Sequence, residues 1–188
     1  MAHNKNKGFS LIELIVTIAI LAIVTGSAVG IFGMLKKGYF NEAYKGTTAF
    51  LSDLRSDTMS KSNEIYGDIY KDSSGYHAEV VKVTTTPSPT GGVSYSYKVL
   101  STTSLGKKAK IYSVDKASGN KTEITASSGH IMIKYNRSNG TFSSKMLGTI
   151  NPHTNAIIGN EISAIHVEYS TLSKTIKLIE TGKYKADK

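Results

Sequence analysis

Cysteine is absent from this sequence of 188 residues. The chain therefore has no disulfide, no thiolate metal site and no cysteine nucleophile. The absence leaves the cellular compartment open, although a domain outside the cell would depend on its own core for stability. Proline is also scarce, with three residues in the chain and none before Pro87.

Acidic side chains are in the minority: 23 Lys and Arg face 14 Asp and Glu, a formal net charge of +9. Such an excess would suit nucleic acid, anionic lipid or an anionic wall polymer. Because the lysines are scattered rather than grouped, a solvated basic surface is the favoured interpretation. The residues that follow the N-terminal apolar segment are enough for one compact domain but not for two.

Charge is nearly missing from Phe9 to Leu35, 27 residues in which Glu13 is the single charged side chain. As an α-helix the segment would be about 40 Å long, and the hydrocarbon core of a bilayer is about 30 Å thick. Because only a helix satisfies its own backbone in lipid, we predict a single membrane-spanning helix. Two lysines precede the span and two follow it, so charge leaves its orientation open.

A secretory signal peptide is the alternative for this segment. Its cleavage site would be Gly26-Ser27-Ala28, and the product would be a secreted binding module beginning at Val29. Two features argue against it: Glu13 lies inside the apolar run, and helical patterning continues past the supposed cut.

That patterning predicts an amphipathic continuation of the helix. Apolar residues and one threonine recur at steps of three and four: Phe40, Tyr44, Thr47, Leu51 and Leu54. We therefore predict one long helix from Phe9 to Ser62, with a first half for lipid and a second half packed on another element. Gly38 and Gly46 each cost a helix about 1 kcal/mol relative to alanine, so a bend near them is allowed.

The stretch KGFSLIELIVTIAILAIV resembles the N-terminus of type IV prepilins and type II secretion pseudopilins. The motif consists of a short basic leader, Gly8, Phe9 and a hydrophobic helix with Glu13 at its fifth position. The resemblance implies that residues 1–8 are a leader facing the cytoplasm from a precursor in the inner (cytoplasmic) membrane. It also implies that prepilin peptidase cuts between Gly8 and Phe9 and methylates the new amine of Phe9. The mature chain would keep 21 basic and 14 acidic side chains, a balance of +7.

The resemblance gives Glu13 a role in subunit assembly. A charged carboxylate at mid-bilayer costs roughly 2.5–3.5 kcal/mol on insertion scales, so such residues usually have partners. In this family the glutamate is proposed to meet the N-terminal amine of a neighbouring subunit, here that of Phe9. Gly26 and Gly30 form a small-xxx-small pair that would let helices approach closely. Many family members carry a proline near Gly30, which this chain lacks.

From residue 63 onward, hydrophobic residues recur at every second position, which predicts a β-rich domain. The predicted strands cover 76–84, 93–100, 109–114, 130–135, 162–169 and 174–180. The predicted connections are a loop over Thr84–Gly92, a turn at Ser118–Asn120 and a hairpin at Asn139-Gly140.

The predicted fold class is α+β: a long N-terminal helix packed on an antiparallel sheet, as in type IV pilins. The expected parts are a leader (1–8), a transmembrane assembly helix (9–35), an amphipathic helix (36–62) and a head domain (63–188). The stretches IKYNRSNGTFSS and KTIKLIETGKY also resemble the C-terminal part of H-type minor pseudopilins.

Signals for enzyme chemistry are missing. The five histidines are dispersed, and no phosphate loop, nucleophile elbow or dinucleotide fingerprint occurs. His130 and His166 fall in predicted strands, where an ordinary core or surface role is favoured. We expect no catalytic residue, no metal and no cofactor.

The favoured function is a structural one: a pilin-like subunit of a surface filament or of a secretion pseudopilus, with other pilin subunits as partners. An alternative is a minor pilin for DNA uptake, because the +7 balance and tyrosines such as Tyr95 and Tyr97 would suit phosphates and bases. Tyrosines at alternate strand positions are more often packing residues.

Overall fold

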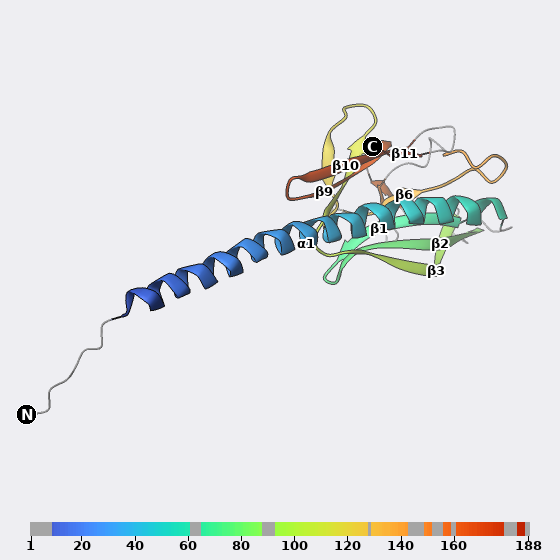
Figure 1. Cartoon of the computed structure of the whole chain (residues 1–188). Helices are drawn as coiled ribbons and strands as arrows, with labels where there is room; N and C mark the ends of the chain where they lie inside the picture. The colour runs from blue at the N-terminus through green and yellow to red at the C-terminus, as the bar shows by residue number, and fades with distance from the viewer. Residues whose placement is uncertain are drawn as a thin grey trace, which may run out of the picture. The chain divides into compact units, whose positions relative to one another are not determined.

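A computed structural model describes residues 9–60, 65–87, 93–127, 129–142, 149–151, 156–158, 161–178 and 184–186. The chain divides into two compact units, Met1–Lys37 and Gly38–Lys188, which are described separately. One helix, α1 (Leu11–Ser60), contributes to both units (Figure 1). The predicted helix of 9–62 is thus confirmed to within two residues at its N-terminal end, and Lys61 and Ser62 lie outside the described residues.

The second unit contains all the strands. They are β1 (Ile65–Asp72), β2 (Gly75–Pro87), β3 (Val93–Gly106), β4 (Lys110–Asp115), β5 (Lys121–Glu123), β6 (Ile131–Ile133), β7 (Thr149–Asn151), β8 (Ala156–Ile158), β9 (Ile162–Tyr169), β10 (Leu172–Leu178) and β11 (Tyr184–Ala186). They form a four-stranded sheet in the order β3-β2-β1-β6, a five-stranded sheet in the order β11-β10-β9-β4-β5, and the pair β7-β8. Every strand pairing in these sheets is antiparallel.

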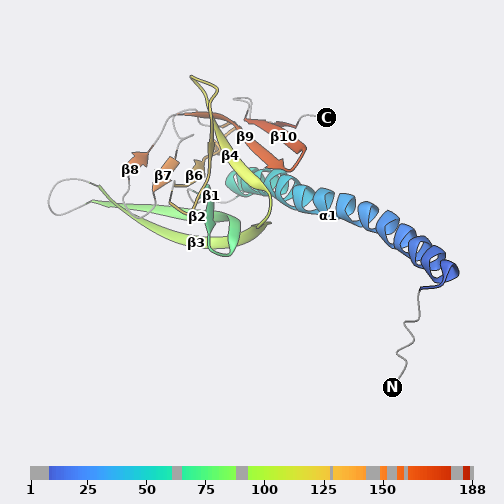
Figure 2. The ribbon, with the colours of Figure 1, turned by 90° about the vertical axis from the view of Figure 1, so that its left-hand side faces the viewer.

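The helix face predicted from the three-and-four spacing is the face that is buried. Thr47, Leu51 and Leu54 are fully buried, Phe40 is nearly so and Tyr44 is half-buried. Within the second unit this part of α1 has β1–β3 on one side and β9–β10 on the other (Figures 1 and 2). The core is therefore formed by one helix face and the inner faces of two sheets, which confirms the α+β fold.

Helix and sheet approach each other closely at Gly67 in β1. A Cβ atom built at this position would lie 2.5 Å from Leu54 Cδ2 and 2.9 Å from Phe50 Cζ. Residues 65, 67 and 69 face the helix, so the alternate residues Tyr66, Asp68 and Tyr70 face the opposite side of the sheet.

The strand predictions are only partly right. Strand β9 has the predicted bounds, and β2, β3, β4, β6 and β10 overlap their predictions; β2 and β3 continue past the predicted ends, to Pro87 and Gly106. Strand β1 was not predicted, because Gly67 interrupts its pattern and its first five residues are all buried. The three-residue strands β5, β7, β8 and β11 were also missed, since three residues show no readable alternation.

The predicted turns have mixed outcomes. The loop prediction is wrong for residues 84–87, which continue β2 to its end at Pro87; residues 88–92 lie outside the described residues. Gly119 has φ +72° in the predicted turn between β4 and β5. Gly140 has φ +63° in the predicted hairpin turn, whose strand pairing is one bridge between Tyr135 and Phe142. Arg55 Nε donates a 3.0 Å hydrogen bond to the carbonyl of Gly140 and so ties this turn to α1.

Candidate functional site

The first unit presents an almost continuous apolar surface. Its exposed large side chains are Phe9, Leu11, Ile12, Leu14, Ile15, Val16, Ile18, Ile20, Leu21, Ile23, Val24, Ile31, Phe32, Met34 and Leu35. By length and composition α1 can cross a membrane, and its most apolar window contributes nothing to the interior of the molecule. An apolar surface of this extent marks a site for lipid or for other protein.

The helix begins with a capping box. The backbone amide of Ser10 donates to Glu13 Oε2 over 3.0 Å, and Ser10 Oγ accepts a longer contact of 3.4 Å from the amide of Ile12. The first intrahelical bond runs from the amide of Leu14 to the carbonyl of Ser10 over 3.2 Å. Glu13 therefore satisfies a backbone donor at the helix N-terminus, where a negative charge is favoured.

Sequence reasoning missed this role of Ser10, although the signal was present. The order Ser-x-x-Glu before an apolar run is the signature of a capping box. It was overlooked because Glu13 was considered as a membrane carboxylate with a partner in another subunit. The structure gives Glu13 a partner in its own chain.

The hydroxyl groups within the apolar segment also bond inside the helix. Thr17 Oγ1 donates to the carbonyl of Glu13, and Thr25 Oγ1 donates to the carbonyl of Leu21 over 2.7 Å. Such back-bonding satisfies a hydroxyl that would otherwise be costly to place in hydrocarbon. The side chains of Thr17 and Thr25 are thus compatible with lipid.

Three glycines leave flat, open positions on the same helix. A Cβ atom built at Gly26, Gly30 or Gly33 would meet no atom within 4 Å. Small residues of this kind let a second helix approach closely in a membrane or a bundle.

The predicted processing residues are only partly described. Gly8 and the rest of the leader lie outside the described residues, while the Phe9 side chain is 83% exposed. The pairing of Glu13 with the Phe9 amine of a neighbouring subunit stays a prediction, as does helix packing through Gly26 and Gly30. Among the described residues no group of three or more His, Asp or Glu could hold a metal ion.

Comparison with protein families gives one match, to the prokaryotic N-terminal methylation motif, over residues 3–29. Curated proteins and solved structures gave no match. The matched region includes Gly8, Phe9, the capping box and Gly26, and the motif implies processing by prepilin peptidase. The likeness to H-type minor pseudopilins has no support from these comparisons and stays a prediction. Residues 3–29 thus carry the N-terminal methylation motif that type IV prepilins and pseudopilins share, and the described part of the chain has a pilin-like α+β fold, with a long helix packed against antiparallel sheets.

Proposed function

We propose that this protein is a structural subunit that assembles through its N-terminal helix into a type IV pilus or a secretion pseudopilus. Prepilin peptidase removes residues 1–8, methylates Phe9 and releases the chain for assembly. The precursor is held in the cytoplasmic membrane with its N-terminus inside. The head domain then faces outward from the filament.

The observation that carries this proposal is the exposed apolar surface of α1 between Phe9 and Leu35. Every large apolar side chain described in this range is at least 46% exposed. A surface of this kind is stable in two environments, the hydrocarbon of a bilayer and a bundle of similar helices. A subunit that moves from membrane to filament needs both.

Two features of α1 support assembly in register. The Glu13 carboxylate lies within the first turn of α1, close to the terminus that cleavage would create. In a low-dielectric bundle, a carboxylate and an amine on neighbouring subunits attract each other strongly. The open positions at Gly26 and Gly30 would allow the close helix approach that brings these charges together.

Chemical cross-linking of whole cells tests the proposal. Wild-type protein should give a ladder of oligomers, whereas Gly8→Arg should give monomer, because an arginine side chain at the cleavage position blocks the peptidase. Lys7→Arg, which keeps the leader charge, is the control and should give the wild-type ladder. A ladder unaffected by Gly8→Arg would overturn the proposal. Recovery of the ladder in sheared surface material distinguishes a pilus from a pseudopilus.

The two alternative functions gain nothing specific from the structure. Tyr97 is half-buried against a second apolar cluster on the sheet, as a packing residue would be, and the side chain of Tyr95 lies outside the described residues. DNA uptake therefore rests on net charge alone. Release of a secreted module after Ala28 would cut inside α1, which runs from Leu11 to Ser60.

A further inference from the structure

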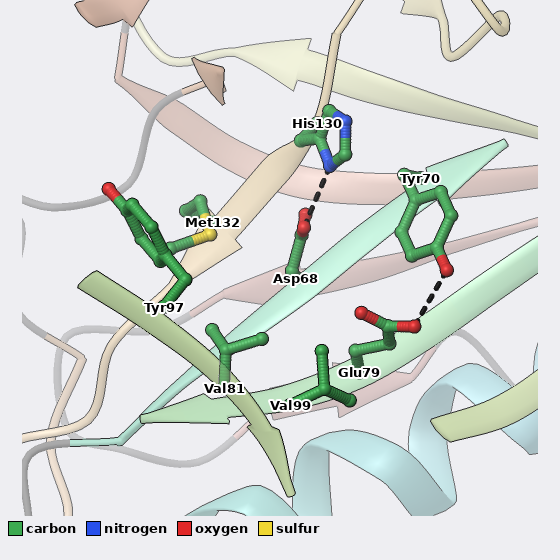
Figure 3. A pocket seen from close by; sticks show the side chains of 8 residues that line it. All are labelled: Asp68, Tyr70, Glu79, Val81, Tyr97, Val99, His130 and Met132. Atoms are coloured by element: carbon green, nitrogen blue, oxygen red, sulfur yellow. Dashed lines mark hydrogen bonds and ion pairs between the residues drawn. The ribbon is translucent and has the colours of Figure 1, made fainter. Parts of the chain in front are cut away.

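A pocket of about 270 Å³ lies on the face of the four-stranded sheet that points away from α1 (Figure 3). Each of the four strands supplies two alternate residues, except that one of the two on β6, His130, lies just before the strand begins. The lining residues are Asp68 and Tyr70, Glu79 and Val81, Tyr97 and Val99, and His130 and Met132. Alternate residues of a strand share one face, so all eight side chains converge on this side of the sheet.

Two carboxylates are brought side by side by the strand register. Asp68 in β1 pairs directly with Glu79 in β2. Like charges at directly opposed positions of an antiparallel pair are destabilising unless a counter-charge or a proton compensates them. The fold therefore concentrates negative charge here, although the chain as a whole carries a net charge of +9.

Asp68 is almost fully buried, with 3% of its surface exposed. Its Oδ2 atom lies 2.7 Å from His130 Nδ1, whereas its Oδ1 atom is buried and has no hydrogen-bond partner among the described residues. Burial raises the pKa of Asp68 above its ordinary value, against the opposing effect of His130. A buried carboxylate oxygen without a donor is costly, and a positive charge placed nearby would offset part of that cost.

Glu79 receives both of its recorded hydrogen bonds on one oxygen. The Tyr70 hydroxyl donates to Oε1 over 2.7 Å and the Thr102 hydroxyl donates over 3.1 Å. Figure 3 shows the other oxygen turned away from Tyr70. Both donors are neutral, and no ion pair joins Glu79 to a cation in the part of the chain that the structure describes, so its negative charge is hydrogen-bonded but not balanced.

The remaining walls of the pocket are apolar. Val81, Val99 and Met132 line it together with the ring of Tyr97. A lysine of the chain itself already packs on this face of the sheet. Lys134 Nζ lies 4.9 Å from the ring centre of Tyr66 and donates to its hydroxyl over 3.2 Å. An aliphatic stem with a cationic end is thus chemically suited to this face.

We propose that this pocket binds a primary alkylammonium group, either a lysine side chain or a small free amine. The ammonium group donates to Glu79 and brings positive charge next to Asp68. The hydrocarbon stem lies along Val81, Val99 and Met132. The volume falls just below the range of about 300–1,000 Å³ that is usual for drug-sized ligands, which fits a short chain rather than a larger molecule.

Methionine methyl groups provide a direct test. The full chain, labelled with ¹³C at its five methionine methyls, is placed in a non-ionic detergent and titrated with n-pentylammonium. The Met132 signal should shift and saturate. The signals of Met34 and Met59, which are exposed on α1 and do not line the pocket, should stay in place. Pentanol, with the same stem and no charge, should shift Met132 much less.

Charge-removing variants complete the test. Glu79→Gln should weaken binding by about tenfold, because it replaces a charge-assisted hydrogen bond by a neutral one. Asp53→Asn removes one negative charge from an exposed position on α1 and should leave the affinity unchanged. The proposal is overturned if pentanol shifts Met132 as strongly as the amine, if the shift does not saturate, or if both variants bind as the wild type does.

The two sources of the ammonium group are separated by dilution without added amine. If a lysine of a second copy fills the pocket, the Met132 signal should depend on protein concentration, and Glu79→Gln should abolish that dependence. If the pocket takes a free amine, the signal should be independent of concentration and should respond only to n-pentylammonium.

Discussion

The amide of Ser10 and the carboxylate of Glu13 are joined by a 3.0 Å hydrogen bond that closes the first turn of α1. Glu13 thus has a structural role within its own chain before any neighbouring subunit arrives. The bond holds the carboxylate at the end of the helix nearest Phe9, where the proposed amine partner of a neighbouring subunit would come to lie. Helix capping and subunit recruitment would use the same side chain.

Substitutions at these two positions separate the roles. Glu13→Gln keeps an oxygen acceptor for the Ser10 amide but removes the charge, so the helix should persist while the oligomer ladder falls by about tenfold or more. Ser10→Ala removes the hydroxyl cap and costs about 1 kcal/mol of helix stability, but it should leave the oligomer ladder unchanged. Circular dichroism in detergent reports the helix, and cross-linking reports assembly. Equal loss of assembly in both variants would show that the cap alone matters.

Because the chain has no cysteine, disulfide cross-linking through a single introduced cysteine can probe close packing at Gly26. Gly26→Cys introduces a unique thiol at an open position, and Val24→Cys places one about 200° away around the helix. If neighbouring helices approach over the glycines, mild oxidation of cells should link Gly26→Cys subunits into dimers and leave Val24→Cys subunits mostly monomeric. The reverse pattern on a non-reducing gel would contradict packing through this face.

The contact between α1 and β1 makes Gly67 intolerant of a side chain. Gly67→Ala should destabilise the protein by about 1–3 kcal/mol, because its methyl group would overlap Leu54 and Phe50. Gly38→Ala is the matched control: its Cβ meets nothing, and alanine should stabilise this exposed helix position by about 0.5–1 kcal/mol. Urea unfolding in detergent measures both. An unchanged midpoint for Gly67→Ala would refute the close approach.

The pocket carboxylate should make stability depend on pH. Burial raises the pKa of Asp68 in the folded protein, so the folded state binds its proton more tightly than the unfolded chain does. The contribution of Asp68 to stability is therefore largest below the unfolded pKa and is lost as pH rises through the raised value. Asp68→Asn removes this loss. The stability of the variant relative to wild type should therefore increase as the pH rises from about 4 to neutrality.

The comparison between variant and wild type cancels the contributions of groups that do not interact with Asp68, whereas His130 and Glu79, which do, remain part of the difference. The hydrogen bonds of Asp72 with Ser74 help to hold its pKa at about 2, and Asp72 titrates alike in both proteins. Thermal unfolding at a series of pH values gives the difference directly. A difference that is constant from pH 4 to 7 would mean that Asp68 does not bind its proton more tightly in the folded state.

The elements that were predictable are those whose pattern is local. The buried face of α1 follows from the spacing of Phe40, Thr47, Leu51 and Leu54, and β9 follows from the alternate apolar residues Ile165, Val167 and Tyr169. The capping box could also have been found from Ser10 and Glu13, since its signature needs four residues. These features depend on a few consecutive turns of the chain.

The features that were missed depend on contacts between distant segments. Strand β1 contains Gly67, a poor strand residue, because the helix leaves no room for a Cβ atom there. The pocket depends on the register of Asp68 with Glu79 and on the position of His130, which lies 62 residues from Asp68 in the sequence. A single sequence does not give such a register.

Mass spectrometry of the N-terminal peptide of the native protein tests the central claim most directly. Protein from sheared surface material and from cell membranes should begin at Phe9, with a methylated amine. Abundance in the sheared fraction indicates a major subunit of a filament, and confinement to membranes indicates a minor pilin or pseudopilin. An intact Met1, or a chain that begins at Val29, would contradict processing by prepilin peptidase and assembly through the amine of Phe9.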